Sequence, residues 1–246
     1  MREGIVTDGS NFTFYQLTLN LLSSFSLSYS ILEFQNANGC PQFPNCLQWI
    51  ADNQHSDGSW GLHSFFLAHD RLLNTLGCVI ALKTWNFICA GVSFVEKNIN
   101  KLEYDITDHM TVGFEVLFPI LLEMAQELQI ELPYDAPILQ DIYAQRKLKL
   151  SKIPKEVLQN EFTTLLFSLE GQKGVVWEKI LKLQCEDGSI FYSPAATAYA
   201  YIHTRDENCL KYLTDVVEKF NGGEKNAAMS KEVARETSTS DEIPIE

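Results

Sequence analysis

The sequence predicts an all-α protein, folded as an α/α-barrel of antiparallel helices. From about Asn45 onward, apolar residues recur at steps of three and four, and no alternating run is long enough for a strand. The motif QxxDGS occurs twice, each time after a helical segment. Helical units that end in the same turn are typical of stacked helices, because each unit buries its apolar face only against its neighbours.

Two predicted helices show this spacing most clearly, and the apolar face of each must pack inward. Glu115 and Glu123 belong to the second helix but lie off its apolar face, so we expect both at the surface. The apolar positions are Leu72, Leu76, Val79 and Ile80 in the first helix, and Phe114, Leu117, Phe118, Leu121, Ala125 and Leu128 in the second.

Helix boundaries are indicated by capping residues, prolines and glycines. Pro154 and the Ser193-Pro194 pair are typical of helix starts, whereas Gly171 and the glycines at 222–223 are typical of helix ends. Asp206 can cap a further helix. The apolar face of that helix holds Leu210, Leu213, Val217 and Phe220.

Composition divides the chain into three segments. Residues 36–223 carry the helical spacing and form the predicted domain. Residues 224–246 contain few apolar side chains among charged and hydroxyl residues, so we expect a disordered tail. Residues 1–35 are apolar but have no clean period, and they form a poorly defined N-terminal segment.

The charge balance excludes several classes of partner. With 19 basic and 32 acidic residues the net charge is −13, which repels nucleic acid and anionic lipid. The apolar stretch 12–34 is interrupted by Gln16, Asn20, Glu33 and serines, so no membrane span is predicted. The opening MREG, followed by Asp8, indicates neither a secretory signal nor a transit peptide.

Cysteines and histidines do not favour a metal site. None of the 6 cysteines makes a CxxC pair, so we interpret most of them as buried thiols in a reducing compartment. His55, His63 and His69 are close in sequence but have no cysteine at a ligand spacing. A structural role is the favoured interpretation of all three.

The two copies of the repeated motif run from Gln54 to Trp60 and from Gln184 to Ile190. Asp-Gly makes a tight turn, and glutamine can bond free backbone groups beside it. An apolar or aromatic residue follows and can anchor the next segment in the core. The motif holds no catalytic group, so it predicts a device that joins successive helices.

Six segments between Cys40 and Gly223 carry a family resemblance. They include HDRLLNTLGCVIALKTWN from residue 69, QRKLKLSKIPKE from residue 145 and TTLLFSLEG from residue 163. In order and spacing they closely resemble plant class II diterpene cyclases of the copalyl diphosphate synthase type. The resemblance covers most of the chain.

The resemblance implies that residues 36–223 form a γ domain, an α-barrel that faces a β domain across the class II active site. That family protonates an alkene of geranylgeranyl diphosphate with an acid in a DxDD motif of the β domain. Neither DxDD nor the class I motif DDxxD occurs in this chain. The resemblance therefore implies half a cleft, inactive alone, since general acid catalysis needs the acid in place.

Three site assignments follow from the resemblance. Phe167 stands where ent-copalyl synthases carry a histidine of the deprotonating base, so we expect no catalytic residue here and a different product or no activity. Lys149 falls at a lysine that helps to hold the diphosphate; the alternative is a solvated helix lysine. Glu103, Asp105 and Asp108 match a thinned acidic loop that would bind Mg2+ weakly; a solvated loop is the alternative.

Two hypotheses for function remain open. In the first, the chain is a truncated terpene synthase whose relatives act in gibberellin or other diterpenoid biosynthesis, with plastid localisation by resemblance and a cytoplasmic location otherwise. In the second, it is a non-catalytic module that binds a prenyl diphosphate or associates with an intact synthase.

Overall fold

The computed structural model of the chain describes residues 39–61, 66–104 and 113–219. Within these ranges the chain is helical and has no strand, apart from an isolated bridge between Ile190 and Ser193. The elements in order are α3 (Pro44–Asp52), α4 (Ala68–Thr84), α5 (Gly91–Asn98), η1 (Ile99–Glu103), α6 (Phe114–Glu127), α7 (Pro137–Lys152), α8 (Lys155–Asn160), η3 (Thr164–Gly171), α9 (Trp177–Ile180), η4 (Leu181–Leu183), α10 (Pro194–Thr204) and α11 (Glu207–Lys219).

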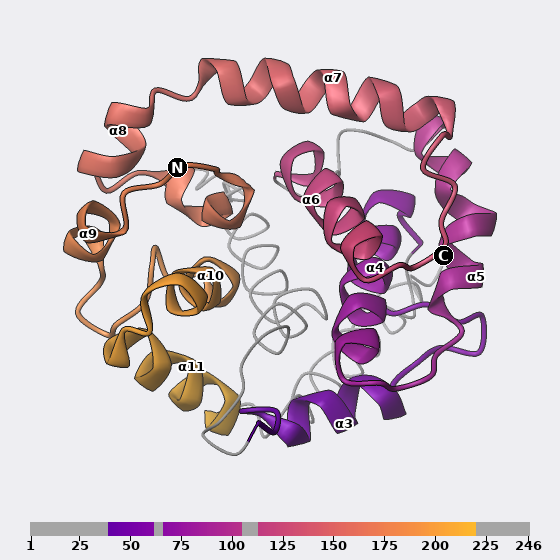
Figure 1. Cartoon of the computed structure of the whole chain (residues 1–246), viewed down its shortest axis with the longest axis horizontal. Helices are drawn as coiled ribbons and strands as arrows, with labels where there is room; N and C mark the ends of the chain where they lie inside the picture. The colour runs from indigo at the N-terminus through magenta and orange to yellow at the C-terminus, as the bar shows by residue number, and fades with distance from the viewer. Residues whose placement is uncertain (1–38, 62–65, 105–112, 220–246) are drawn as a thin grey trace, which may run out of the picture.

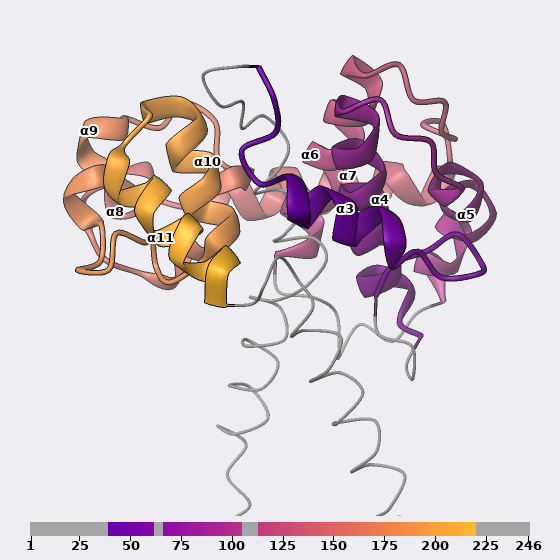
Figure 2. The same cartoon turned by 90° about the horizontal axis from the view of Figure 1, so that it is seen from below.

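The helices form two concentric arcs. Figure 1 shows α4, α6 and α10 on the inside and α3, α5, α7, α8, α9 and α11 around them. Helices that follow one another in sequence pack together, as α4 does with α5, α6 with α7, and α10 with α11. The side view in Figure 2 separates α3–α6 from α8–α11. The predicted all-α barrel is confirmed.

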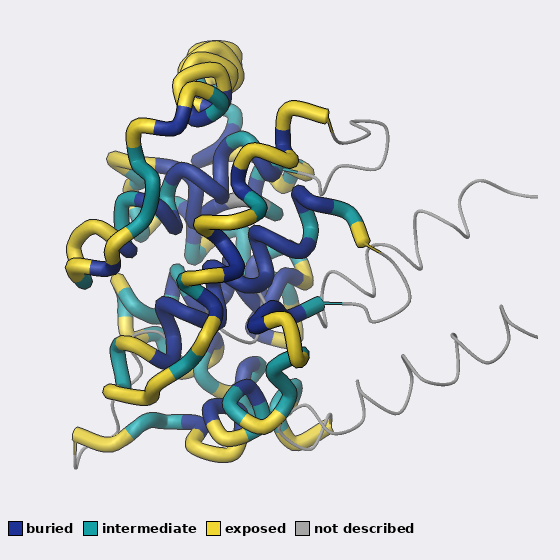
Figure 3. Tube along the Cα trace, turned by 90° about the vertical axis from the view of Figure 1, so that its right-hand side faces the viewer, coloured by how far each residue is buried: buried dark blue, intermediate teal, exposed yellow. Residues whose placement is uncertain are grey.

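The inner helices owe their position to their composition. Every residue of α4 from Arg71 to Leu82 is buried, which requires protein on all sides of the helix. On α6 the predicted inward positions from Phe114 to Ala125 are buried, and Leu128 is half-buried. Figure 3 shows these buried stretches inside an exposed outer layer.

Two hydrophobic cores meet along α10. The larger core contains side chains from α3, α4, α5, η1, α6 and α7, and the smaller one contains side chains from α8, η3, α9 and α11. Ala195 and Ala198 belong to the larger core, whereas Ala196 and Ala200 belong to the smaller. Small side chains on both faces let α10 lie between the two cores, and the half-buried Tyr199 packs against both.

The predicted helix boundaries agree with the structure where it describes them. The Ser193 hydroxyl accepts a hydrogen bond from the Ala196 amide at the start of α10, and Asp206 Oδ1 accepts one from the Cys209 amide in α11. Pro154 precedes α8, and η3 ends at Gly171. Phe220, the glycines at 222–223, the 224–246 tail and the 1–35 segment lie outside the described residues.

No helix in the described ranges is long and apolar enough to cross a membrane.

Candidate functional site

The predicted diphosphate lysine, Lys149, is engaged by a carboxylate. Its Nζ donates to Glu115 Oε1 at 2.6 Å, which joins α7 to α6. The Lys149 side chain is 47% exposed, whereas that of Glu115 is only 14% exposed. The expectation of a surface position is therefore wrong for Glu115, because the α6–α7 contact covers its carboxylate. Lys149 pairs with Oε1, whereas Oε2 is buried without a hydrogen-bond partner in the described residues.

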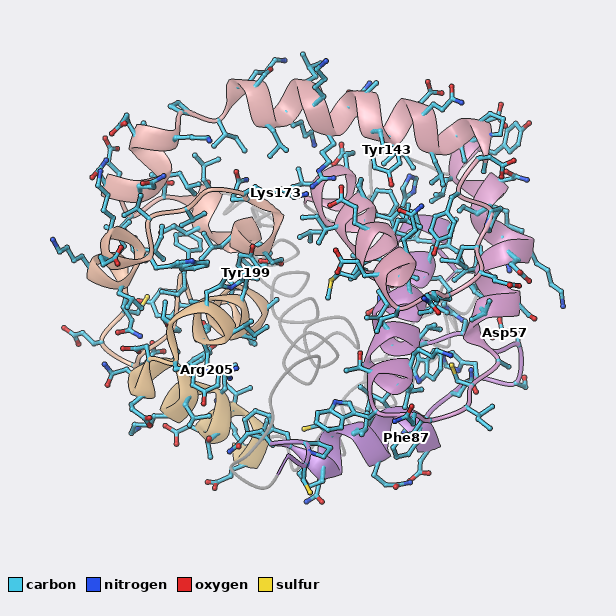
Figure 4. All side chains as sticks on the ribbon, viewed as in Figure 1. Asp57, Phe87, Tyr143, Lys173, Tyr199 and Arg205 are labelled. Atoms are coloured by element: carbon cyan, nitrogen blue, oxygen red, sulfur yellow. The ribbon has the colours of Figure 1, made fainter. Side chains whose placement is uncertain are left out.

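A second ionic cluster lies two turns further along α6. Glu123 accepts hydrogen bonds from Arg146 of α7 and from Lys173, which follows η3. Its side chain is 34% exposed, so the surface expectation holds only in part. Burial raises the pKa of Glu123, but hydrogen bonds from Lys173 and Arg146 outweigh burial and lower the pKa below its ordinary value. Figure 4 shows Lys173 beside α6.

The segment that carries Phe167 is a 3-10 helix, η3, with Phe167 half-buried. In a 3-10 helix, residues three apart eclipse one another, so Glu170 lies on the same edge as Phe167. Glu170 is 3% exposed, and burial raises the pKa of its carboxyl to about 8. This segment therefore presents a phenyl ring and a buried acid that is protonated at neutral pH.

The predicted Mg2+ ligands are only partly described. Glu103 is exposed and ends η1, whereas Asp105 and Asp108 lie outside the described residues, so the site stays a prediction. Within the described ranges no group of three or more histidine, cysteine or acidic side chains is placed to hold a metal ion. One exposed carboxylate by itself gives Mg2+ too few oxygen ligands.

The described histidines contact other protein groups, and three of the six cysteines are buried as expected, whereas Cys40 is exposed and Cys89 and Cys185 are half-buried. His55 Nε2 lies 2.8 Å from the Gly61 carbonyl oxygen, and the His69 ring packs edge-on against Phe114. His63 lies outside the described residues. None of the six cysteines, all of which lie in the described ranges, forms a disulfide, and burial raises the pKa of Cys46 and Cys209 to about 12, which keeps both uncharged.

Sequence reasoning missed two features of this region. The first is Glu170, which looks like an ordinary surface glutamate in the string SLEG. The second is the Arg146–Glu123–Lys173 cluster. The sequence holds part of the evidence for this cluster. Glu115 and Glu123 are eight residues apart on α6, and their partners Lys149 and Arg146 are three residues apart on α7. Such spacings place each set on one helix face.

Comparisons with known proteins assign this fold. No protein-family profile matches the chain. A crystal structure of ent-copalyl diphosphate synthase from Arabidopsis thaliana, in complex with (S)-15-aza-14,15-dihydrogeranylgeranyl thiolodiphosphate, superposes with a TM-score of 0.79. The two sequences are 46% identical, and the superposition covers 86% of this chain and 33% of the synthase chain. The chain belongs to the plant copalyl diphosphate synthase-like terpene synthases.

Other members of this terpene synthase family agree. A chloroplastic (−)-kolavenyl diphosphate synthase of Tripterygium wilfordii is 58% identical over 189 residues, which are 75% of this chain and 23% of the relative. The chloroplastic ent-copalyl diphosphate synthase of Arabidopsis thaliana is 54% identical over 190 residues, or 76% of this chain and 24% of the relative. Abietadiene synthase from Abies grandis has a TM-score of 0.77 at 38% identity, covering 87% of this chain and 29% of that one.

The chain thus spans about a quarter of the length of these curated relatives.

Proposed function

We propose that this chain is one wall of a class II diterpene cyclase active site and that it does not cyclise a prenyl diphosphate by itself. The carrying observation is the superposition on an ent-copalyl diphosphate synthase that holds a geranylgeranyl thiolodiphosphate analogue. Geranylgeranyl diphosphate is the substrate that we assign to the intact site. Alkene protonation requires a strong, positioned acid, and no DxDD motif is present.

Lys149 is the residue that we assign to the diphosphate. A phosphate oxygen must compete with the Glu115 carboxylate for Nζ, and the negative charge of that carboxylate also repels the diphosphate, so part of the binding free energy is lost. Lys149 is also 47% exposed, and charge interactions are weak in water. Binding by this wall alone is therefore expected to be weak, and Mg2+ held by Glu103, Asp105 and Asp108 would strengthen it by neutralising the diphosphate.

Phe167 bears on the product of the intact enzyme. A phenyl ring cannot accept a proton, so the cyclised cation must lose its proton to another group or be trapped in another way. Two relatives that are 58% and 53% identical to this chain over the aligned residues are named for different products, kolavenyl diphosphate and copal-8-ol diphosphate. We therefore assign the intact enzyme to diterpenoid biosynthesis in the plastid, with a product other than ent-copalyl diphosphate.

Turnover is tested first, on the purified chain. After incubation with geranylgeranyl diphosphate and Mg2+, the products are dephosphorylated and analysed for copalol and related alcohols by mass spectrometry. We expect none above a no-protein control, since a missing general acid alone costs about two to four orders of magnitude in rate. Cyclised alcohols above the control would show that this chain contains an acid that we have not identified.

Calorimetric titration with the same substrate tests the diphosphate assignment. We expect Lys149→Ala to weaken binding and Glu115→Gln to strengthen it, because the second change frees Nζ. Lys147→Ala is the matched control, since Lys147 is an exposed lysine on the same helix. Equal affinities for Lys149→Ala and Lys147→Ala would remove Lys149 from the site.

A further inference from the structure

A second feature of this region is the carboxyl group of Glu170, which is buried in η3. Leu166 and Leu169 of η3 are fully buried in the smaller core, which fixes the orientation of the segment. η3 packs against α10 and α6. A Cβ on the adjacent Gly171 would come within 2.2 Å of Val116 Cγ1, so η3 ends in direct contact with α6.

The carboxyl group has almost no compensation for this burial. Its own backbone amide supplies a hydrogen bond, and Oε2 has no hydrogen-bond partner within the described part of the chain. A buried carboxylate in such surroundings is costly, whereas a neutral carboxylic acid is tolerated. The side chain thus fits its site only while it holds a proton.

The charged groups on the packed elements do not relieve this cost. On α10, burial and the charge of an ionised Glu170 raise the pKa of Tyr199, which therefore stays a neutral phenol and offers Glu170 no positive charge. His203, further along α10, is exposed and stacks on Trp177. On α6, Glu115 and Glu123 are already paired with Lys149 and with Arg146 and Lys173.

We propose that Glu170 is a proton-dependent latch: as a neutral acid it allows η3 to pack against α6 and α10, and its ionisation loosens that packing. The latch acts on Phe167, because both residues lie on one edge of η3. It goes beyond the proposed function, since it requires neither substrate nor metal. Loss of the proton would move the segment of the proposed cleft wall that carries Phe167.

The sign of the effect follows from linkage. The pKa of Glu170 rises from its ordinary 4.5 to about 8 on folding, so the folded state holds the proton more tightly than the unfolded state. Below pH 4.5 the group is protonated in both states and changes nothing. Between the two pKa values the folding equilibrium constant falls by up to tenfold for each pH unit, and above about 8 it is level again.

Urea denaturation of the full chain between pH 5 and pH 9 tests the latch. Glu170→Gln keeps the shape and cannot ionise, so its stability relative to the wild-type chain should increase with pH up to about 8. Glu178→Gln is the matched control, since Glu178 is an exposed glutamate on α9, and it should follow the wild-type profile. Parallel profiles for the wild type and Glu170→Gln would overturn the proposal.

Two further measurements locate the effect. Hydrogen exchange of the η3 amides, corrected for the intrinsic rate at each pH, should show at least tenfold less protection at pH 8.5 than at pH 6.5 in the wild type, and no such change in Glu170→Gln. Carbon NMR of the glutamate side chains needs no variant: a titration midpoint near 8 supports the latch, and all midpoints near 4.5 would refute it.

Discussion

The first turn of the repeat, from Gln54 to Trp60, and the second, from Gln184 to Ile190, are built from the same hydrogen bonds. In each turn the glutamine Nε2 donates to the glycine carbonyl oxygen at 2.9 Å. In each, the aspartate Oδ1 accepts from the serine amide at 3.0 Å and from the serine hydroxyl at 2.6 Å. The motif therefore specifies one local structure in two places.

The two turns also share a hydrogen bond made by the residue that follows DGS. The Trp60 amide donates to the Thr75 hydroxyl of α4, and the Ile190 amide donates to the Thr197 hydroxyl of α10. Each turn is thus attached to the inner helix that follows it, although the two threonines stand at different distances along the chain.

The surroundings of the two turns differ. Arg71 of α4 contacts the first turn, where it donates to the Ser59 hydroxyl and lies 4.0 Å from Asp57 Oδ2. At the second turn, Gln184 also donates to Asp206 and to the Cys209 thiol. The first turn is therefore linked to α4 by the guanidinium group of Arg71, and the second is linked to α11 by the side-chain amide of Gln184.

The two turns also differ in how the chain leaves them. After the first turn the chain continues through Gly61, at φ +141°. After the second, only residues 191–193 lead into α10, and Phe191 and Tyr192 both have positive φ, at 51° and 55°. The left-handed region is unfavourable for side chains, so the short second connection stores backbone strain at these two residues. The repeated motif specifies the turn but not the connection that follows it.

The largest expected loss of stability at the turns comes from replacing the residue after DGS. Trp60 and Ile190 are both fully buried, but the larger Trp60 also donates its indole N–H to the Ile50 carbonyl oxygen at 2.8 Å. Trp60→Ala should lower the free energy of unfolding by about 4 kcal/mol and Ile190→Ala by about 3 kcal/mol. Urea denaturation measures both. A larger loss for Ile190→Ala would reverse the ranking of the two turns.

The glycines of the two turns should differ next. Gly58 and Gly188 have φ of +90° and +88°, so a side chain is strained at both. A Cβ would meet the Ala90 carbonyl oxygen at 2.8 Å in the first turn and the Asn208 carbonyl oxygen at 2.3 Å in the second. We expect losses of about 2 kcal/mol for Gly58→Ala and about 3 kcal/mol for Gly188→Ala, from the same denaturation experiment. Similar losses would mean that backbone strain outweighs the clash.

The charge on Arg71 should distinguish the turns at low pH. Burial raises the pKa of Asp57, but hydrogen bonds from Ser59 and the charge of Arg71 outweigh it, so the pKa is lowered on folding. Asp57 therefore contributes stability that is present above its unfolded pKa and is lost as pH falls through its folded pKa.

Arg71→Met removes the charge and the hydrogen bond to Ser59 but keeps an apolar stem. It should lower stability by about 1 to 2 kcal/mol at pH 7 and reduce the loss on acidification. Thermal unfolding between pH 3 and pH 7 measures both effects. Lys182→Met, at an exposed lysine, is the control and should stay within about 0.5 kcal/mol of wild type. An unchanged acid profile in Arg71→Met would show that Arg71 does not set the pKa of Asp57.

The smallest expected effect is a gain at the strained connection. Tyr192 is 58% exposed, and its ring packs loosely against Phe162 with centroids 6.5 Å apart. Asparagine tolerates the left-handed region better than tyrosine, so Tyr192→Asn should stabilise the chain by about 0.5 kcal/mol. Differential scanning calorimetry resolves such a shift. A loss above about 1 kcal/mol would mean that the aromatic contact is worth more than the strain.

Local patterns by themselves determined much of this protein. The step of three and four residues marked the buried face of α6, Ser193 and Asp206 marked two helix starts, and the QxxDGS strings marked both turns. Each of these features depends on residues within a few positions of one another. The hydrogen bonds in these features join residues only a few positions apart, so the local sequence is enough to predict them.

Only the tertiary structure decided which charges meet. A helical period indicates that Lys149 lies on a face of α7, but not that Glu115, 34 residues earlier, holds its ammonium group. Glu170 shows the same limit, because its string is that of a surface turn, and its burial comes from α6 and α10 closing over η3. Burial and pairing depend on what packs against a residue from elsewhere in the chain, and these contacts set whether a carboxyl is charged or neutral.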